Sequence, residues 1–224
     1  MQTLTSHIAL VFDKCLFTKD PMSSSIGQAI VRESVEMMAS QGLDHFTFKK
    51  LAHKLDSTES TIYRYFQNKN QLANYLASWH WSQLEWRIAF ATANISDPKL
   101  RLQKAIHELC VWVKNNPSTR QLNEAKLQQL VINTGFSAFV PADLSKAERE
   151  GYLAAYSFLI NRLAEIIKVS YQKTSHPHSF ATLLIEAIQH QMFLQLNAPS
   201  LTDIKGKEDQ IEAFILQIFL TETI

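Results

Sequence analysis

The spacing of apolar residues predicts helices along most of the chain. From residue 26 to residue 41, apolar side chains recur every three or four positions, and this stripe stops at Gly42. That period is typical of an amphipathic helix, and glycine commonly follows the last residue of a helix. We therefore predict a first core helix over 26–41. Residues 1–25 form an N-terminal extension, either a small accessory helix or, as we expect, a weakly ordered segment.

Two shorter helices are predicted next. The first begins near Thr47, the chain then turns through Asp56 and Ser57, and the second runs from Thr58 to about Tyr65. A threonine hydroxyl accepts hydrogen bonds from the N–H groups that a first helical turn leaves free, so both threonines are suitable caps. Together with the first core helix, these segments make a three-helix unit.

The remaining residues predict a larger helical body. A long helix over 69–94 carries apolar residues on two faces, as expected of a helix that is packed on two sides. Asparagine, glycine and proline residues divide the sequence after it into further helices, expected over about 98–114, 118–132, 142–173, 178–197 and 207–222. The chain is thus predicted to be all-α with about nine helices, in an N-terminal domain over 26–70 and a second domain over 71–224.

The composition is that of a soluble globular protein, with 46% hydrophobic and 19% charged residues. The formal net charge of +1 gives no overall attraction to nucleic acid, so any DNA-binding surface must be local. Cys15 and Cys110 lie far apart and lack the spacing of metal ligands, which indicates free thiols in a reducing cytoplasm. The apolar run over 8–12 is too short for a membrane span and follows no basic region. We therefore expect a cytoplasmic protein with no membrane association.

Basic charge is concentrated in the two short helices. Between Thr47 and Asn70 there are five basic and two acidic residues, a balance of +3 within a chain of +1. Outside its apolar anchors, the second short helix offers hydroxyl, phenol, guanidinium and carboxylate groups. Such a helix suits the DNA major groove, where these groups meet base edges while the preceding helix lies across the phosphates. The pair therefore predicts a helix-turn-helix that binds double-stranded DNA.

The order of residues in this region resembles the DNA-binding domain of TetR/AcrR-type transcriptional regulators. The pattern is G-x₄-T-x₃-L-A, a turn, and then T-x-x-T-I-Y-x-Y-F-x-N-K-x-x-L, between residues 42 and 72. The residues that carry it are Gly42, Thr47, Leu51, Ala52, Thr58, Thr61, Ile62, Tyr63, Tyr65, Phe66, Lys69 and Leu72. The number and lengths of the later helices are consistent with that family's ligand-binding and dimerisation domain.

The resemblance implies DNA contacts for individual residues. Thr61 and Tyr65 would lie at base-reading positions, and Tyr63 and Lys69 would contact phosphates. Thr47 would bind phosphate at the head of the preceding helix. With neighbours on the same exposed face, the candidate DNA-binding residues are Thr47, Lys49, Thr58, Glu59, Ser60, Thr61, Tyr63, Arg64, Tyr65 and Lys69.

Three features depart from the family pattern. Asp56 stands at the turn where the family usually has glycine, and Ser57 stands where it usually has valine. Many relatives carry a basic arm before the first helix, whereas here only Lys14 and Lys19 precede it. A minor-groove contact by the N-terminal extension is therefore not expected.

The body offers candidates for two further sites. Its aromatic residues are numerous enough to line a pocket for a small apolar or amphipathic effector, although aromatic stripes at helical spacing more often form simple core. The candidate pocket residues are Trp86, Phe90, Trp112, Phe136, Tyr152 and Tyr156. The last two helices are too apolar for one chain to cover, which favours a two-fold interface in a homodimer. The candidate interface residues are Leu184, Ile188, Met192, Ile211, Phe214, Ile215 and Ile218.

We predict a ligand-responsive transcriptional regulator, a homodimer that represses by binding a palindromic operator, with activation left open. One alternative is an effector-independent DNA-binding protein of nucleoid or cell-division architecture. The other is a helical interaction module that has lost DNA binding. The sequence has no glycine-rich phosphate loop, nucleophile elbow or H-E-x-x-H run, so we expect no enzymatic activity, no metal and no cofactor.

Overall fold

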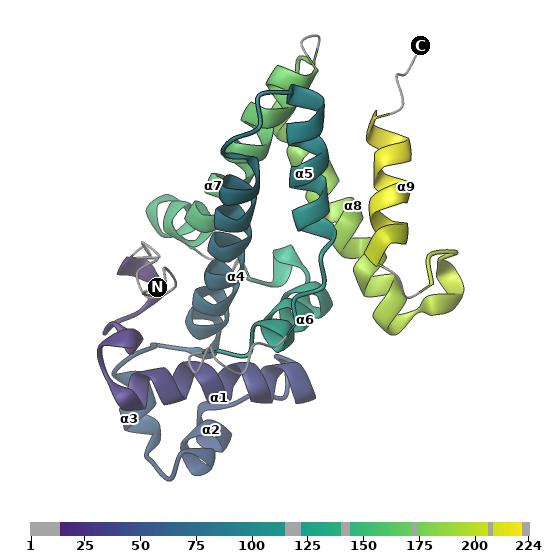
Figure 1. Ribbon diagram of the computed structural model, residues 1–224. Coiled ribbons are helices and arrows are strands. Elements are labelled where there is room, and N and C mark those ends of the chain that lie inside the picture. Colours follow the sequence, from purple (N-terminus) through teal and green to yellow (C-terminus); the bar gives the residue numbers. More distant parts are fainter. Residues whose placement is uncertain (1–13, 115–121, 140–143, 172–173, 206–207, 221–224) are drawn as a thin grey trace, which may run out of the picture.

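The computed structural model describes residues 14–114, 122–139, 144–171, 174–205 and 208–220. Within these ranges, all regular structure is helical, with nine α-helices and four short 3-10 helices. Helices α1 to α3 gather at one end of the molecule, and α4 runs from them into the body (Figure 1). None of the described helices is long and apolar enough to cross a membrane. The all-α prediction is confirmed.

The N-terminal helices are α1 (Ser25–Gln41), α2 (Phe48–Lys54) and α3 (Glu59–Tyr63). Their shared core is built from apolar side chains that are fully buried, among them Ile30, Leu51, Ile62 and Phe66. Burial of such side chains stabilises a fold by about 1.5–3 kcal/mol each. Helix α3 ends at Tyr63, earlier than expected, and the chain then turns back toward α1.

Residues 14–24 differ from the expected loose extension. They form the 3-10 helices η1 (Lys14–Leu16) and η2 (Pro21–Ser23), and they pack against the rest of the chain. Leu16 is only 2% exposed, which makes it part of the core. The expectation of weak order is wrong for these residues, because apolar side chains and backbone hydrogen bonds fix them, whereas residues 1–13 lie outside the described ranges.

The body consists of the remaining six α-helices of the described residues. Their bounds are α4 (Lys69–Thr92), α5 (Pro98–Cys110), α6 (Glu124–Thr134), α7 (Lys146–Ser170), α8 (Pro177–Asn197) and α9 (Glu208–Leu220). Helix α4 packs against α5, α6 and α7, while α9 packs against α5 and α8. Several of these helices are shorter than predicted, and the expected start near 118 lies outside the described residues.

The early end of α5 has a local cause. The side chain of Gln128 accepts a hydrogen bond from the backbone N–H of Val113 at 2.8 Å. It also donates one to the backbone oxygen of Val111 at 2.9 Å. The backbone groups after Cys110 therefore bond to α6 instead of continuing the helix, and Gln128, which is buried, has both ends of its amide occupied.

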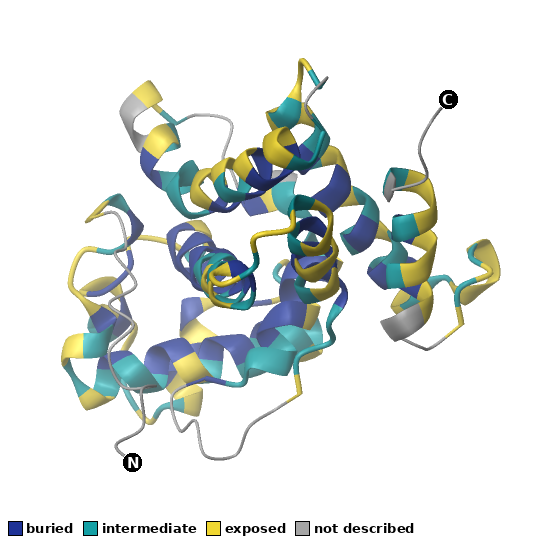
Figure 2. Cartoon of the chain, turned by 45° about the horizontal axis from the view of Figure 1, so that its top comes forward, coloured by how far each residue is buried: buried dark blue, intermediate teal, exposed yellow. Residues whose placement is uncertain are grey.

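Helix α4 is buried on nearly all sides at first and on fewer sides later. Residues 71–81 are all buried, whereas Trp86 is 42% exposed and Phe90 is 75% exposed. We expected these two aromatic residues on an inward face. Once α4 has left the N-terminal helices, its neighbours cover only part of its surface, and the two rings stack on each other with centroids 5.6 Å apart. Figure 2 shows how exposed and buried positions alternate along the helices.

The turn between α2 and α3 gives a stability prediction. Asp56 is the single residue other than glycine with a positive φ among those described, at 47°. Aspartate tolerates this left-handed conformation, but a β-branched side chain does not. We expect Asp56→Val to lower the free energy of unfolding by about 1–2 kcal/mol, measured by urea denaturation.

The matched control is the same change at Asp44, which is also exposed but has no positive φ. Asp56→Gly should be tolerated, because glycine adopts this conformation freely. Equal losses from Asp56→Val and Asp44→Val would contradict this account of the turn.

Candidate DNA-binding surface and body cavity

The helix-turn-helix is fixed by threonine caps and by a small aromatic cluster. Thr47 Oγ1 accepts a hydrogen bond from the Lys50 N–H at 3.3 Å, and Thr58 Oγ1 accepts one from the Thr61 N–H at 3.3 Å. The rings of Phe48 and Tyr63 meet edge to face, with centroids 5.1 Å apart. Both predicted caps are confirmed, and the Phe48–Tyr63 contact joins α2 to α3.

Most of the candidate DNA-binding residues are exposed or half-buried, on α2, α3 and the turns beside them. The exposed ones are Thr47, Lys49, Thr58, Glu59, Ser60, Tyr63 and Arg64, and the half-buried ones are Thr61 and Lys69. The surface therefore carries hydroxyl groups, a phenol and basic groups from α2 and α3. These are the groups that can bond to phosphate oxygens and to base edges.

Tyr65 was wrongly placed on this surface. It is 2% exposed, and its hydroxyl lies 2.8 Å from Ser24 Oγ, the cap of α1. Because α3 ends at Tyr63, the side chain of Tyr65 turns toward α1 instead of following the exposed face. Lys19 Nζ lies 5.3 Å from the centre of its ring. Tyr65 is thus a core residue that joins α1 to the end of α3.

Two lysine side chains form hydrogen bonds to backbone oxygens of the loop between α1 and α2. Lys50 Nζ donates to the backbone oxygen of His45 at 2.7 Å, and Lys69 Nζ lies 3.4 Å from that of Leu43. An ammonium group has three hydrogens, so each lysine retains donors for a further acceptor. The lysines can therefore hold the loop and a phosphate at the same time.

Three further exposed residues of α2, two lysines and a histidine, were not among the predicted DNA-binding residues. Lys50, His53 and Lys54 lie on the same helix as Lys49 and are exposed. Lys49 and His53 are four residues apart, as are Lys50 and Lys54, so helical periodicity places each pair on one face. That spacing was visible in the sequence and was the signal that could have found them.

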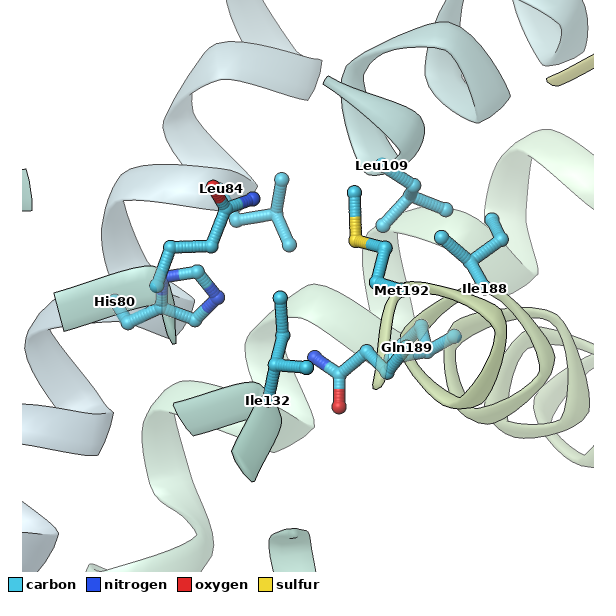
Figure 3. Close-up of a pocket in the computed structure, with 9 residues that line it drawn as sticks. His80, Leu84, Leu109, Ile132, Ile188, Gln189 and Met192 are labelled. Carbon is cyan, nitrogen blue, oxygen red and sulfur yellow. The ribbon is translucent and has the colours of Figure 1, made fainter. Parts of the chain in front are cut away.

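The body contains a small cavity between α4, α5, α6 and α8. It is lined by His80, Leu84, Leu109, Gln128, Ile132, Ile185, Ile188, Gln189 and Met192. Figure 3 shows these side chains around a common space. The cavity measures about 10 Å³, which is close to the space that one water molecule needs. In this conformation it accommodates nothing larger.

None of the six predicted aromatic residues lines this cavity. Trp86 and Phe90 point to the surface, and Trp112 and Tyr152 are half-buried against the core. The rings of Phe136 and Tyr156 stack on each other at 4.2 Å. Helical periodicity identifies an apolar face without showing which neighbour fills it, so a role of these six residues in effector binding stays a prediction.

The cavity is electrically neutral near pH 7. Burial, followed by the positive charge of Arg87, lowers the pKa of His80 to about 3. The guanidinium of Arg87 is directed to α5, where it donates to the Glu108 backbone oxygen at 2.7 Å and pairs with its carboxylate at 3.4 Å. Neither the imidazole nor the amides of Gln128 and Gln189 brings a net charge to the cavity.

The candidate interface residues of α8 and α9 divide into two groups. Buried within the chain itself are Leu184, Ile188, Met192, Ile211 and Ile215. Phe214 is 38% exposed and Ile218 is 53% exposed. The assignment of the first group to a dimer interface is wrong for this conformation, because α8 and α9 pack against each other and against the body helices. Leu183 and Leu196 of α8 are additional exposed apolar residues.

Comparisons with known proteins identify the N-terminal domain. The family model described as bacterial regulatory proteins, tetR family, matches residues 30–76, which include α2, α3 and the start of α4. No curated protein matches the chain.

Several solved structures resemble the chain over most of its length. A crystal structure of AibR with isovaleryl coenzyme A and operator DNA is 15% identical, with a TM-score of 0.60 over 85% of this chain and 96% of that chain. The fatty acid degradation regulator FadR from Bacillus halodurans is 16% identical, with a TM-score of 0.59 over 87% and 94%. A transcriptional regulator from Rhodococcus sp. Rha1 is 16% identical, with a TM-score of 0.57 over 89% and 97%. At these identities the similarity is one of fold.

Burial of His80 gives a pH prediction. Its pKa is about 3 in the folded chain and 6.5 in the unfolded one, so between these values the unfolded state binds more protons. Stability therefore falls as the pH decreases through this window, by up to about 1.4 kcal/mol per pH unit. We expect His80→Gln to flatten the dependence of the free energy of unfolding on pH between pH 6 and pH 4.

His190→Gln is the matched control, since His190 is exposed on α8. Urea denaturation at each pH measures both variants. Curves for His80→Gln and the unmodified chain that stay parallel over this window would refute the role of His80.

Proposed function

We propose that the chain is a DNA-binding transcriptional regulator of the TetR type and acts as a homodimeric repressor of a palindromic operator. The observation that carries this proposal is the surface formed by α2 and α3. It combines hydroxyl groups at the start of α3 with basic side chains on α2, in the domain that the family model matches.

Base reading is assigned to the first residues of α3. Ser60 and Thr61 lie in its first turn, and in a helix-turn-helix these positions face the base edges of the major groove. Hydroxyl groups bond to either strand, and the methyl group of Thr61 suits contact with a thymine methyl. Glu59 repels phosphate, so its place is opposite a cytosine amine or away from the backbone.

Phosphate binding is assigned to α2 and to the groups that flank α3. Lys49 and Lys54 of α2 and Arg64, which follows α3, are exposed cations. Tyr63 is 50% exposed, and its ring packs edge to face against Phe48. This contact restricts the side chain before DNA binds and so lowers the conformational entropy that binding costs. Neutralised phosphates release counterions, so these contacts make binding dependent on salt.

Dimerisation is assigned to the outer sides of α8 and α9. Leu183, Phe214 and Ile218 are exposed apolar residues of these helices, and α9 carries exposed positions along its outer side (Figure 2). Two copies related by a two-fold axis bury such faces against each other. The same axis places two copies of α3 on successive turns of a palindromic site.

An effector site is assigned to the cavity around His80. Its lining is apolar apart from neutral polar groups, so it suits a small uncharged apolar or amphipathic molecule. The AibR structure contains isovaleryl coenzyme A as well as operator DNA, so one protein of this fold combines both kinds of ligand. Since the cavity measures about 10 Å³, an effector would have to separate the surrounding helices.

The small cavity also favours the alternative of an effector-independent DNA-binding protein. A cavity too small for a ligand at this place is what such a protein would have. A ligand screen distinguishes the two. An operator affinity that changes with one class of small molecule supports the effector, and an affinity that stays constant across a broad screen supports the alternative.

Selection from random double-stranded DNA tests the central proposal. The full chain is incubated with a random pool, bound DNA is amplified, and enriched sequences are checked by footprinting next to the gene itself. Recovery of a palindromic motif is the expected result. Absence of any enriched sequence at low salt would overturn sequence-specific DNA binding.

Substitutions on α2 and α3 should act differently on DNA binding. Lys49→Ala should weaken binding to all sequences about equally and reduce the salt dependence by about one counterion. Thr61→Ala should cost about 1–3 kcal/mol on the preferred operator and less on a variant site, because it removes a base contact. Fluorescence anisotropy at several salt concentrations measures both effects.

Lys104→Ala is the control for charge, since Lys104 is exposed on α5, outside the DNA-binding domain. It should leave both the affinity and the salt slope unchanged. A Thr61→Ala chain with undiminished sequence preference would argue against base reading at this position.

A substitution on α9 should dissociate the dimer. Ile218→Glu places a charge in the proposed interface twice, once per copy, and should weaken self-association by about 2 kcal/mol or more, roughly thirtyfold. Sedimentation equilibrium measures the change. Phe90→Glu is the control, because Phe90 is a 75% exposed aromatic residue on α4. Equal self-association of both variants would reject the α8–α9 interface.

A further inference from the structure

Residues 14–24 form a short segment, here called the N-terminal strap, that contacts both halves of the molecule. Its first part, η1, lies against α4 and α7, and its second part, η2, packs along α1 (Figure 1). The strap lies outside the region 30–76 that the family model matches. It therefore contacts the DNA-binding helices from outside the matched region.

The strap contacts the end of α3, the recognition helix of the proposed helix-turn-helix, at three points. The backbone N–H of Thr18 donates to the Tyr65 backbone oxygen at 2.8 Å. The Tyr65 hydroxyl lies 2.8 Å from Ser24 Oγ, and Lys19 Nζ lies 5.3 Å from the ring centre. Since α3 has only five residues, contacts to Tyr65 act within two residues of its C-terminal end.

The strap is also joined to α4. Gln71, a buried polar residue of α4, donates from Nε2 to the Cys15 backbone oxygen at 2.7 Å. Its Oε1 accepts from the Gln67 N–H at 2.7 Å, so the same amide fixes the connection between α3 and α4. The Phe17 ring meets Tyr75 edge to face at 6.1 Å. Leu16, 2% exposed, anchors the segment in the core.

Close packing of the strap on α1 depends on one glycine. A Cβ atom on Gly27 would lie 2.2 Å from the backbone oxygen of Pro21, a distance that non-bonded atoms do not adopt. The clash would be with backbone and not with a flexible side chain, so any side chain at this position displaces η2. The two parts of the strap can thus be disturbed separately, at Leu16 and at Gly27.

We propose that the N-terminal strap positions the recognition helix relative to the body, and so sets the separation of the two recognition helices in the dimer. The inference rests on the proposed function. The DNA-binding helices are joined to the body through α4 and through the packing of α1 against α6, and both links lie away from the end of α3. Because the strap joins Tyr65 at the end of α3 to α4 and α7, it opposes a rotation of these helices relative to the body at a further point. Leu16, Gly27 and Gln71 are positioning residues in this account.

The test uses operators whose half-sites are moved closer or farther by one base pair. The full chain discriminates against the shifted operators, because the two recognition helices of the dimer lie at a fixed distance from each other. Leu16→Ala and Gly27→Ala should reduce the ratio of dissociation constants between shifted and optimal operators by roughly two- to thirtyfold, the range found when coupling contacts are lost. Affinity for a single half-site should change by less than about twofold, since no strap residue is assigned a DNA contact.

Leu102→Ala is the matched control, because Leu102 is fully buried in α5, away from the strap. This variant loses core packing, but its ratio of dissociation constants between shifted and optimal operators should be that of the unmodified chain. An unchanged ratio in both strap variants, with half-site affinity intact, would overturn the inference. Failure of the unmodified chain to bind any operator would instead count against the proposed function.

A second measurement covers the case in which a strap variant loses half-site binding altogether. A spin-labelled unnatural amino acid at His53, which is exposed on α2, reports the distance between the two DNA-binding domains of the dimer in the absence of DNA. Strap variants should broaden the distance distribution, and Leu102→Ala should not. A distribution as narrow as that of the unmodified dimer would refute the strap's role.

Discussion

Burial of the first half of α4 is the constraint on which the two parts of the molecule depend. Leu72, Tyr75 and Leu76 are fully buried, although α4 is leaving one domain and entering another. Each such side chain contributes about 1.5–3 kcal/mol through the surface it removes from water. No break at this junction can expose them without losing several of these contributions together. The DNA-binding helices and the body are therefore parts of one continuous core.

Polar side chains on the same part of α4 determine which segments of the chain pack against it. Asn74 donates to the Phe139 backbone oxygen, and Gln71 donates to that of Cys15. A buried amide without its partner costs about 1–3 kcal/mol, so these bonds fix which segments lie against α4. One of them holds the strap and the other holds the connection between α6 and α7. The helix thus selects its neighbours as well as attracting apolar surface.

What the sequence predicted well depends on short-range physics. A hydroxyl at Thr47 or Thr58 caps the helix that follows it, whatever the rest of the chain does. The helix-turn-helix was recognisable because its signals lie within about thirty residues. Tyr65 was misplaced because its orientation depends on where α3 ends. The end of α3 in turn depends on contacts with α1 and the strap, which are distant in sequence.

Periodicity was least informative where neighbours decide exposure. Ile211, Ile215 and Ile218 fall on one side of α9 by their spacing, yet the first two are buried and the third is half-exposed. Burial on that side stops after Ile215. Trp86 and Phe90 likewise follow the apolar spacing of α4, yet both are exposed. An apolar residue indicates that a partner is favourable, but it does not say whether the partner is the same chain, a second copy or a ligand.

Two helices, α4 and α6, line the cavity and also contact the DNA-binding domain, which bears on how an effector would act. His80 and Leu84 of α4 and Ile132 of α6 line the cavity. Helix α6 also reaches α1, where Lys126 pairs with Glu36 and Asn123 donates to the same carboxylate at 3.0 Å. Burial raises the pKa of Glu36, but the bonds from Lys126 and Asn123 outweigh it, so the pKa lies below its usual value.

A ligand larger than water therefore cannot enter this cavity without moving α4, α6 or the helices opposite them, because the side chains around it are closely packed. Movement of α6 would act on α1 through the Glu36 contacts, and movement of α4 would act on α3 through Gln71. Only differential affinity for the two arrangements can shift their populations. The strap then has a definite part in such a response, since it connects α4 and α7 directly to the end of the recognition helix.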